Sequence, residues 1–272
     1  MRLAPSPASP WWHQAFWEAV SVENTELGRA AWLLGAHRSA LINSADDIEQ
    51  GLSDMDELAA SRQRGSFDAW QRLLFVDLGL TGNGIDYHDV RNSFLPDVLV
   101  RRVGIPISLA VVGIEIGRRL GLDIDGIGLP GHFLLAIRSG KETRFIDAFN
   151  GGAAMDIGDV AARFSSMFGD GQPFHPSYLA PSTSTQIIVR MLANLKQNYA
   201  RQRDLAGLRD VLRLRSCLPG TSITEVRELA RLHHAAGDLD EALRILDHAE
   251  LANPAASAII DTERARVLAQ LN

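Results

Sequence analysis

Residues 92–152 contain the pattern that decides the fold. Four segments carry it: Asn92-Ser93-Phe94-Leu95, Gly104-Ile105-Pro106-Ile107-Ser108-Leu109, Pro130-Gly131-His132-Phe133-Leu134 and Phe145-Ile146-Asp147. Pro106 suits the first turn of a helix, because its φ is fixed and it lacks the N–H that would be left unpaired there. Apolar residues then run almost continuously from 107 to 120. The sequence therefore predicts a central helix that other elements cover on most sides.

A polar stripe follows one side of this predicted helix. Ser108, Glu115 and Arg119 share helical spacing, so the stripe begins near the N-terminal end and continues through Glu115. Oriented amides at a helix N-terminus favour an anion or a thiolate. Ser108 and Glu115 are therefore candidate site residues.

A hairpin is predicted next, with strands over 132–138 and 141–147 and Ser139-Gly140 as its turn. A two-residue loop would place His132 directly opposite Asp147. A four-residue loop would make the pair diagonal on one face, and a three-residue loop would separate the two side chains onto opposite faces. Such a pair is either a general base with its orienting acid or a buried structural contact, and the structural interpretation is favoured.

A helix N-terminus, a strand histidine and an aspartate on the adjacent strand follow in the order of papain-like and transglutaminase-like catalytic cores. The motifs above resemble those of bacterial transglutaminase-like core proteins of the SirB type. The resemblance implies an α+β fold: a helical N-terminal segment, a central helix on a small antiparallel sheet, and an α-helical repeat tail. It also implies a Cys-His-Asp triad, with His132 as the base and Asp147 as its orienter.

The cysteine of that triad is missing. The resemblance places the nucleophile at or beside Pro106, and Ser108 is the nearest residue with a nucleophilic atom, whereas the single cysteine, Cys217, lies far downstream. A serine hydroxyl is too weakly acidic to form the anion–imidazolium pair that a thiol forms. The favoured function is a non-catalytic protein- or peptide-binding, regulatory module. The alternative is a hydrolase or acyltransferase using Ser108, His132 and Asp147.

Five residues around this constellation are further candidates for binding: Asn92, Pro106, Glu115, Pro130 and Gly131. Asn92 has an alternative role as a helix cap, and Pro130-Gly131 suits either a tight turn or a substrate cleft. Nearby, Asp86, His88 and Asp89 crowd into one short loop, which is more typical of a solvated loop than of a metal site. No metal or cofactor site is predicted.

Composition restricts the partners. The 272 residues are 46% hydrophobic, which suffices for one large or two modest domains. The formal net charge of -6 gives no electrostatic footprint for nucleic acid or an anionic membrane. Residues 1–10 contain three prolines and no apolar core, so we expect a flexible segment rather than a signal peptide. No later apolar run is long enough to span a bilayer, and a cytoplasmic location is expected.

Three regions are predicted: a flexible segment over 1–10, a transglutaminase-like domain over 11–183, and tetratricopeptide-like repeats over 184–272. The helices expected in the first part cover residues 12–19, 26–41, 55–63 and 67–78, and residues 153–183 are expected to be irregular. In the tail, Arg203-Asp204-Leu205 matches Gly237-Asp238-Leu239 at an offset of 34, the period of tetratricopeptide repeats. Such repeats either hold a peptide in their groove or only cover the core, and the sequence supports both interpretations equally.

Overall fold

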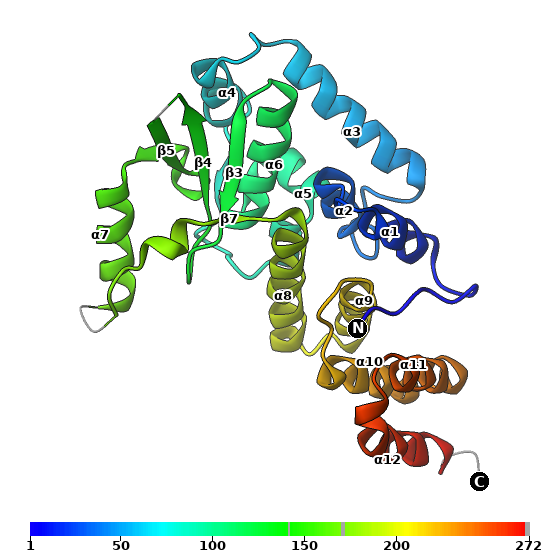
Figure 1. Cartoon of the computed structure of the whole chain (residues 1–272). Coiled ribbons are helices and arrows are strands. Elements are labelled where there is room, and N and C mark those ends of the chain that lie inside the picture. Colours follow the sequence, from blue (N-terminus) through cyan, green and yellow to red (C-terminus); the bar gives the residue numbers. More distant parts are fainter. Residues whose placement is uncertain (141, 170–171, 270–272) are drawn as a thin grey trace. The chain divides into compact units, whose positions relative to one another are not determined.

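The structure, a computed structural model, describes residues 1–140, 142–169 and 172–269 (Figure 1). Residue 141, residues 170–171 and residues 270–272, predicted to belong to a strand, the irregular segment and the repeat tail, lie outside the described residues. The chain forms two compact units. We call Glu26–Met191 the sheet unit, and Met1–Thr25 with Leu192–Asn272 the helical unit.

The sheet unit is built on one antiparallel sheet in the order β6-β5-β4-β3-β7. Its strands are β3 (Asp123–Ile127), β4 (Leu134–Ser139), β5 (Glu142–Asp147), β6 (Ala153–Met155) and β7 (Pro181–Ser182). The central helix α6 (Pro106–Arg119) packs on this sheet, and twelve of its 14 residues are buried. The predicted α+β fold, with a central helix on a small antiparallel sheet, is confirmed.

The register of the β4–β5 hairpin differs from the predicted one. Ser139 pairs with Glu142, so Ser139 belongs to the strand and the loop begins with Gly140. Gly140 has a φ of +61°, which glycine adopts without steric cost and which a two-residue hairpin loop requires at its first position. The change moves the pairing by two residues, and a shift of two keeps each side chain on its predicted face.

The helices that precede the sheet also differ from the predicted boundaries. They are α2 (Leu27–Leu33), α3 (Ala45–Ala60), α4 (Phe67–Arg72) and α5 (Leu95–Arg101). The first ends well before residue 41, where the chain turns and Ser39 Oγ donates a 2.6 Å hydrogen bond to Asp97. The second begins ten residues earlier than expected, because Ser44 and Asp47 form a capping box. Two short strands, β1 (Thr81–Gly82) and β2 (Val103–Gly104), pair in parallel beside α6.

The segment predicted to be irregular contains regular structure. Helix α7 (Ile157–Phe168) follows β6 and starts at Asp156, which forms a capping box with Asp159. Val160 and Phe164 are its buried residues, one turn apart. The glycines and serines nearby hide this short amphipathic pattern.

The helical unit contains α1 (Trp11–Ser21), the second part of α8 (Ser184–Gln202), α9 (Leu205–Ser216), α10 (Ile223–Ala235), α11 (Leu239–Ala252) and α12 (Ser257–Leu268). The offset of 34 recurs in the backbone: Arg203 and Gly237 both have positive φ, and Asp204 and Asp238 follow them as the residues that precede α9 and α11.

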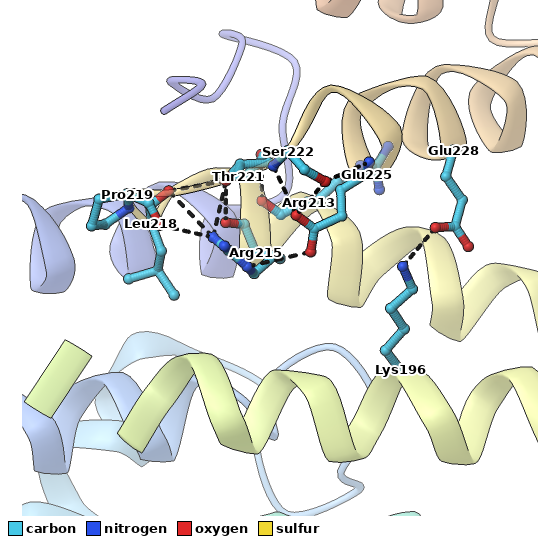
Figure 2. A network of polar contacts seen from close by, with 10 residues as sticks. Lys196, Arg213, Arg215, Leu218, Pro219, Thr221, Ser222, Glu225 and Glu228 are labelled. Atoms are coloured by element: carbon cyan, nitrogen blue, oxygen red, sulfur yellow. Dashed lines mark hydrogen bonds and ion pairs between the residues drawn. The ribbon is translucent and has the colours of Figure 1, made fainter. Parts of the chain in front are cut away.

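A network of polar contacts fixes the connection from α9 to α10 (Figure 2). Arg215 Nη1 donates to the carbonyl oxygens of Leu218 and Pro219 at 3.4 and 3.2 Å and to Thr221 Oγ1 at 3.0 Å. Ser222 caps α10 in a capping box with Glu225. The arginine therefore binds carbonyl groups of the loop that follows α9, and Thr221 Oγ1 donates to the Arg215 carbonyl at 3.0 Å, near the end of α9.

Residues 1–10, for which the prolines predicted flexibility, make specific contacts within the helical unit. Leu3 is buried, and its N–H donates to the Ser216 carbonyl at 2.8 Å. Arg2 Nε donates to the Cys217 carbonyl at 2.8 Å, and its guanidinium lies 4.6 Å from the centre of the Trp17 ring. These anchoring residues precede the prolines, so the composition of the segment does not reveal them.

Candidate functional site

A tight turn presents His132. The His132 N–H donates to the Leu129 carbonyl at 3.2 Å, and Gly131 between them has a φ of +70°. Proline at the second position and a left-handed glycine at the third are typical of a type II turn. Arg190 Nη2, from α8, donates to the carbonyl oxygens of Leu129 and His132, each at 2.7 Å. Pro130 and Gly131 thus shape the turn, and Arg190 holds its two ends.

His132 and Asp147 are in contact. His132 Nε2 lies 3.0 Å from Asp147 Oδ2, and only 7% of His132 is exposed. Asp147 is fully buried and accepts four more contacts: the N–H groups of Phe149 and Asn150 at 3.0 and 3.2 Å, Asn150 Nδ2 at 2.7 Å, and Arg163 Nη1 at 2.6 Å. The carboxylate therefore has donors on all sides, which holds the imidazole beside it.

Electrostatics favour an ionised Asp147. Burial by itself raises the pKa of this carboxyl, but hydrogen bonds from His132 and Asn150 and the charge of Arg163 outweigh it, and the pKa is lowered. With Nε2 committed to Asp147, the other ring nitrogen of His132 has no hydrogen-bond partner in the described part of the chain. That nitrogen is the one a neighbouring nucleophile would need.

The Ser108 hydroxyl forms hydrogen bonds with backbone groups. Its Oγ donates to the Asn92 carbonyl at 2.5 Å and accepts from the Ile105 N–H at 3.1 Å. The side chain is fully buried, and a Cβ at Gly104 would lie 2.8 Å from Oγ. Within the described residues, no hydrogen bond joins Ser108 to His132. The structure therefore brings together two members of the candidate triad and gives the third a capping role at the start of α6.

Asn92 has a full set of internal partners. Its Nδ2 donates to the carbonyl oxygens of Asp86 and Tyr87 at 2.7 and 3.3 Å, and its Oδ1 accepts from Asn83 Nδ2 and Arg101 Nη1 at 3.0 and 3.3 Å. The side chain is fully buried. Asn92 therefore ties the preceding loop to α5, and through its carbonyl to Ser108.

One acidic residue of that loop, Asp89, is paired as well. Asp89 forms ion pairs with Arg91 at 2.7 Å and Arg101 at 3.0 Å. No cluster of three or more His, Cys, Asp or Glu side chains that suits a metal ion occurs among the residues that the structure describes.

The remaining two candidates lie on α6. Pro106 is buried at its first position, where it has no nucleophilic atom. Glu115 lies nine residues further along, roughly 14 Å down the helix axis. Its carboxylate pairs with Arg119 at 2.7 Å and packs against Gly28, where an added Cβ would lie 2.4 Å from Glu115 Oε2. Glu115 thus serves the packing of α6 on α2.

Three polar residues of the site were missed by the sequence analysis: Asn150, Arg163 and Arg190. Asn150 follows Asp147 closely enough for its side chain to turn back, a local signal that was available in the sequence. Arg163 and Arg190 reach the site from α7 and α8, so only the packing of those helices brings them there.

Comparison with known proteins identifies the family of the chain. A family model described as the transglutaminase-like superfamily matches residues 37–193, more than half of the chain. The chain belongs to the transglutaminase-like superfamily.

Similar proteins include UPF0162 proteins of bacteria. The one from Xylella fastidiosa is 42% identical over 135 residues, which is 48% of each chain, and the one from Vibrio cholerae is 33% identical over 141 residues, 52% of each. F-box only protein 21 of Pongo abelii is 28% identical over 199 residues, 69% of this chain and 31% of that protein. This chain spans about half the length of the bacterial relatives it matches.

The described ranges contain no helix that is a candidate membrane span. None of the helices there combines the length and apolar character that crossing a bilayer requires.

Proposed function

We propose that this chain is a non-catalytic member of the transglutaminase-like superfamily, of the SirB type, that binds a protein or peptide partner and acts as a regulatory module. One observation carries the proposal: Ser108 Oγ, the candidate nucleophile at the start of α6, donates its proton to the Asn92 carbonyl at 2.5 Å. A hydroxyl committed in this way has no base to activate it.

Cys217, the single cysteine of the chain, does not offer an alternative nucleophile. Cys217 is fully buried in the helical unit, and burial raises the pKa of its thiol to about 12. The thiolate is the reactive form of cysteine, so this residue stays inert at neutral pH. His132 and Asp147 then act as a structural pair that holds the turn at Leu129 against β5.

Two observations support binding to a partner. The similarity to F-box only protein 21 covers 31% of that protein, so a region of this kind also occurs within a longer chain. In the helical unit, the recurrence at an offset of 34 supports tetratricopeptide-like repeats over residues 184–272, following a transglutaminase-like domain over 11–183. A cytoplasmic location and the absence of a cofactor belong to the same proposal.

A fluorophosphonate probe, which labels activated serines, tests the proposal against the hydrolase alternative. We expect no more labelling of the wild-type chain than of Ser108→Ala. Labelling that Ser108→Ala abolishes while the fold is retained would establish the hydrolase or acyltransferase instead.

Partner binding needs its own measurement. The tagged chain should retain a partner from cells without added substrate, and the purified pair should re-form a stable complex on size-exclusion chromatography. Failure to retain any partner under low-salt washing would contradict the binding function.

A further inference from the structure

Helix α12 has two polar faces with opposite charge balance. On one, Arg264 pairs with Asp247 at 2.9 Å, Glu250 at 2.6 Å and Asp261 at 2.6 Å. On the other, the single carboxylate of Glu263 is shared by the guanidinium groups of Arg227, Arg231 and Arg266. We call Arg227, Arg231, Glu263 and Arg266 the arginine cluster. Arg227 and Arg231 come from α10, whereas Glu263 and Arg266 belong to α12, and Arg264 on the other side of α12 allows a comparison.

The arginine cluster carries unbalanced positive charge. Glu263 is 2% exposed, and hydrogen bonds from Arg231 lower the pKa of its carboxyl to about 2, so it is ionised at neutral pH. One carboxylate balances one of three guanidinium groups, and no other acid pairs with them in the described part of the chain. Two positive charges therefore remain on this face of a chain whose formal net charge is -6.

The three arginines have donors left over. Arg231 binds Glu263 through Nε and Nη2, Arg227 through Nη2 at 3.3 Å, and Arg266 through Nη1. Arg227 Nε is buried and has no hydrogen-bond partner in the ranges that the structure describes. The side chains of Arg231 and Arg266 are 52% and 58% exposed, so their free N–H groups face solvent. A carboxylate from outside can reach them.

An apolar side chain borders the cluster. Ile259, Glu263 and Arg266 follow one another at spacings of four and three residues, which places them on one face of α12. Ile259 is 43% exposed. Guanidinium groups beside an exposed isoleucine fit a segment that carries both acidic and apolar side chains, which is a property of proteins rather than of nucleic acid.

We propose that the arginine cluster, together with Ile259, is a docking surface for an acidic segment of a protein partner, one that bears carboxylates and an aliphatic side chain. The inference rests on the proposed binding function and gives the chemistry of one contact with the partner. The incoming carboxylates take the free N–H groups of Arg231 and Arg266, and the aliphatic side chain covers Ile259.

Fluorescence anisotropy with the full chain tests this surface. The probe is a fluorescein-labelled peptide that is rich in glutamate and contains two leucines, and the control peptide has glutamine in place of every glutamate. We expect Arg231→Gln with Arg266→Gln to weaken binding of the acidic peptide about tenfold at low salt. Arg264→Gln, on the fully paired face, should leave binding unchanged, and the glutamine peptide should bind the wild-type chain weakly.

A second variant gives a result that unfolding cannot imitate. Glu263→Gln removes the internal competitor while keeping the shape of the side chain, so the acidic peptide should bind more tightly. Equal binding by the wild-type chain and the double variant, equal losses in the double variant and Arg264→Gln, or weaker binding by Glu263→Gln would each overturn the proposal. So would displacement of the peptide by a single-stranded oligonucleotide of the same net charge.

The two proposals fail separately. If the double variant still forms the complex with the cellular partner at full affinity, the docking surface is wrong and the binding function stands. If the fluorophosphonate probe labels Ser108, the non-catalytic assignment is wrong whatever the peptide does.

Discussion

Pro106 lies at or beside the position where the resemblance to cysteine-type catalytic cores places the nucleophile. We expect Pro106→Cys to create a thiol with a pKa about two units below the ordinary 8.5, because it would sit at a helix N-terminus in a site that holds His132. The rate of alkylation by iodoacetamide as a function of pH measures this value. Cys217, whose thiol pKa is raised to about 12 by burial, should stay unmodified in the same experiment.

His132 provides the control for that variant. Combining Pro106→Cys with His132→Gln should return the thiol pKa towards its ordinary value, since the imidazolium partner is lost. An ordinary thiol pKa in both proteins would mean that His132 does not face the start of α6.

Asp147 accepts hydrogen bonds and an ion pair from several residues of the site, so its substitution should lower the free energy of unfolding. We expect Asp147→Asn to lower the free energy of unfolding by about 3 kcal/mol at neutral pH, because it leaves Arg163 without its buried partner. Asp123→Asn is the matched control: Asp123 pairs with Arg138 at 2.8 Å but is mostly exposed, so the cost should stay below about 1 kcal/mol. Urea unfolding measures both.

The stability difference between the wild-type chain and Asp147→Asn should depend on pH. The folded-state pKa of Asp147 is lower than its unfolded value of 3.8, so the stability it contributes is present above pH 3.8 and is lost as the pH falls through the folded value. The difference between the wild-type chain and Asp147→Asn should therefore shrink on acidification. A constant difference would show that Asp147 does not titrate with a lowered pKa.

Rules based on local sequence predict only part of this site. The two-residue loop predicted His132 opposite Asp147. In the structure His132 precedes β4 and the register differs by two residues, yet the two side chains are in contact at 3.0 Å. Ser108 is a candidate nucleophile only in the alternative hypothesis, because its spacing shows that the hydroxyl is near the helix start but not that the Asn92 carbonyl accepts its proton.

At the level of elements, β1 depends on a close contact with the turn after β5. A Cβ at Gly82 would lie 2.4 Å from the Phe149 ring, and Phe149 donates its N–H to Asp147. Gly82→Ala should therefore cost about 2 kcal/mol through overpacking, measured by thermal unfolding. Gly84→Ala should be nearly neutral, since nothing lies within 4 Å of that position. Equal effects at the two glycines would mean that the contact is not tight.

The sequence predicts elements best where one periodic pattern dominates. The apolar run of α6 identifies that helix from residue 107 onward, one residue after its observed start. Helices α3 and α7 start at capping boxes in polar surroundings, where apolar periodicity is weak. The hairpin turn is predicted at Ser139-Gly140, whereas Ser139 pairs with Glu142 and the left-handed Gly140 begins the loop.

At the scale of the whole chain, residues from both ends form the helical unit. Leu3 is buried there, so Leu3→Ala should destabilise this unit by about 2 kcal/mol or more. Leu251→Ala makes the same chemical change at a position that is 79% exposed and should cost little. Hydrogen exchange measures the outcome: amides of α9 should exchange faster in Leu3→Ala, while those of α6 should not change. Faster exchange in both units would contradict the expectation that Leu3 stabilises only the helical unit.

This pairing of distant segments is beyond sequence rules, because no periodic pattern links residue 3 to residue 216. Those rules depend on neighbours within a few turns of helix or one hairpin. The contact between Leu3 and Ser216 is tertiary, and the sequence-based division at residue 11 therefore does not contain it.

Pro106 has one more consequence, for any attempt to restore acyl-transfer chemistry. Such chemistry needs backbone amides aimed at the oxyanion of a tetrahedral intermediate, and a donor at the nucleophile itself commonly contributes. Proline brings no amide hydrogen, so this helix start lacks the side-chain nucleophile and one oxyanion donor at the same residue. We expect Pro106→Cys to supply both at that residue, whereas the thiol of Ser108→Cys should stay buried against the Asn92 carbonyl.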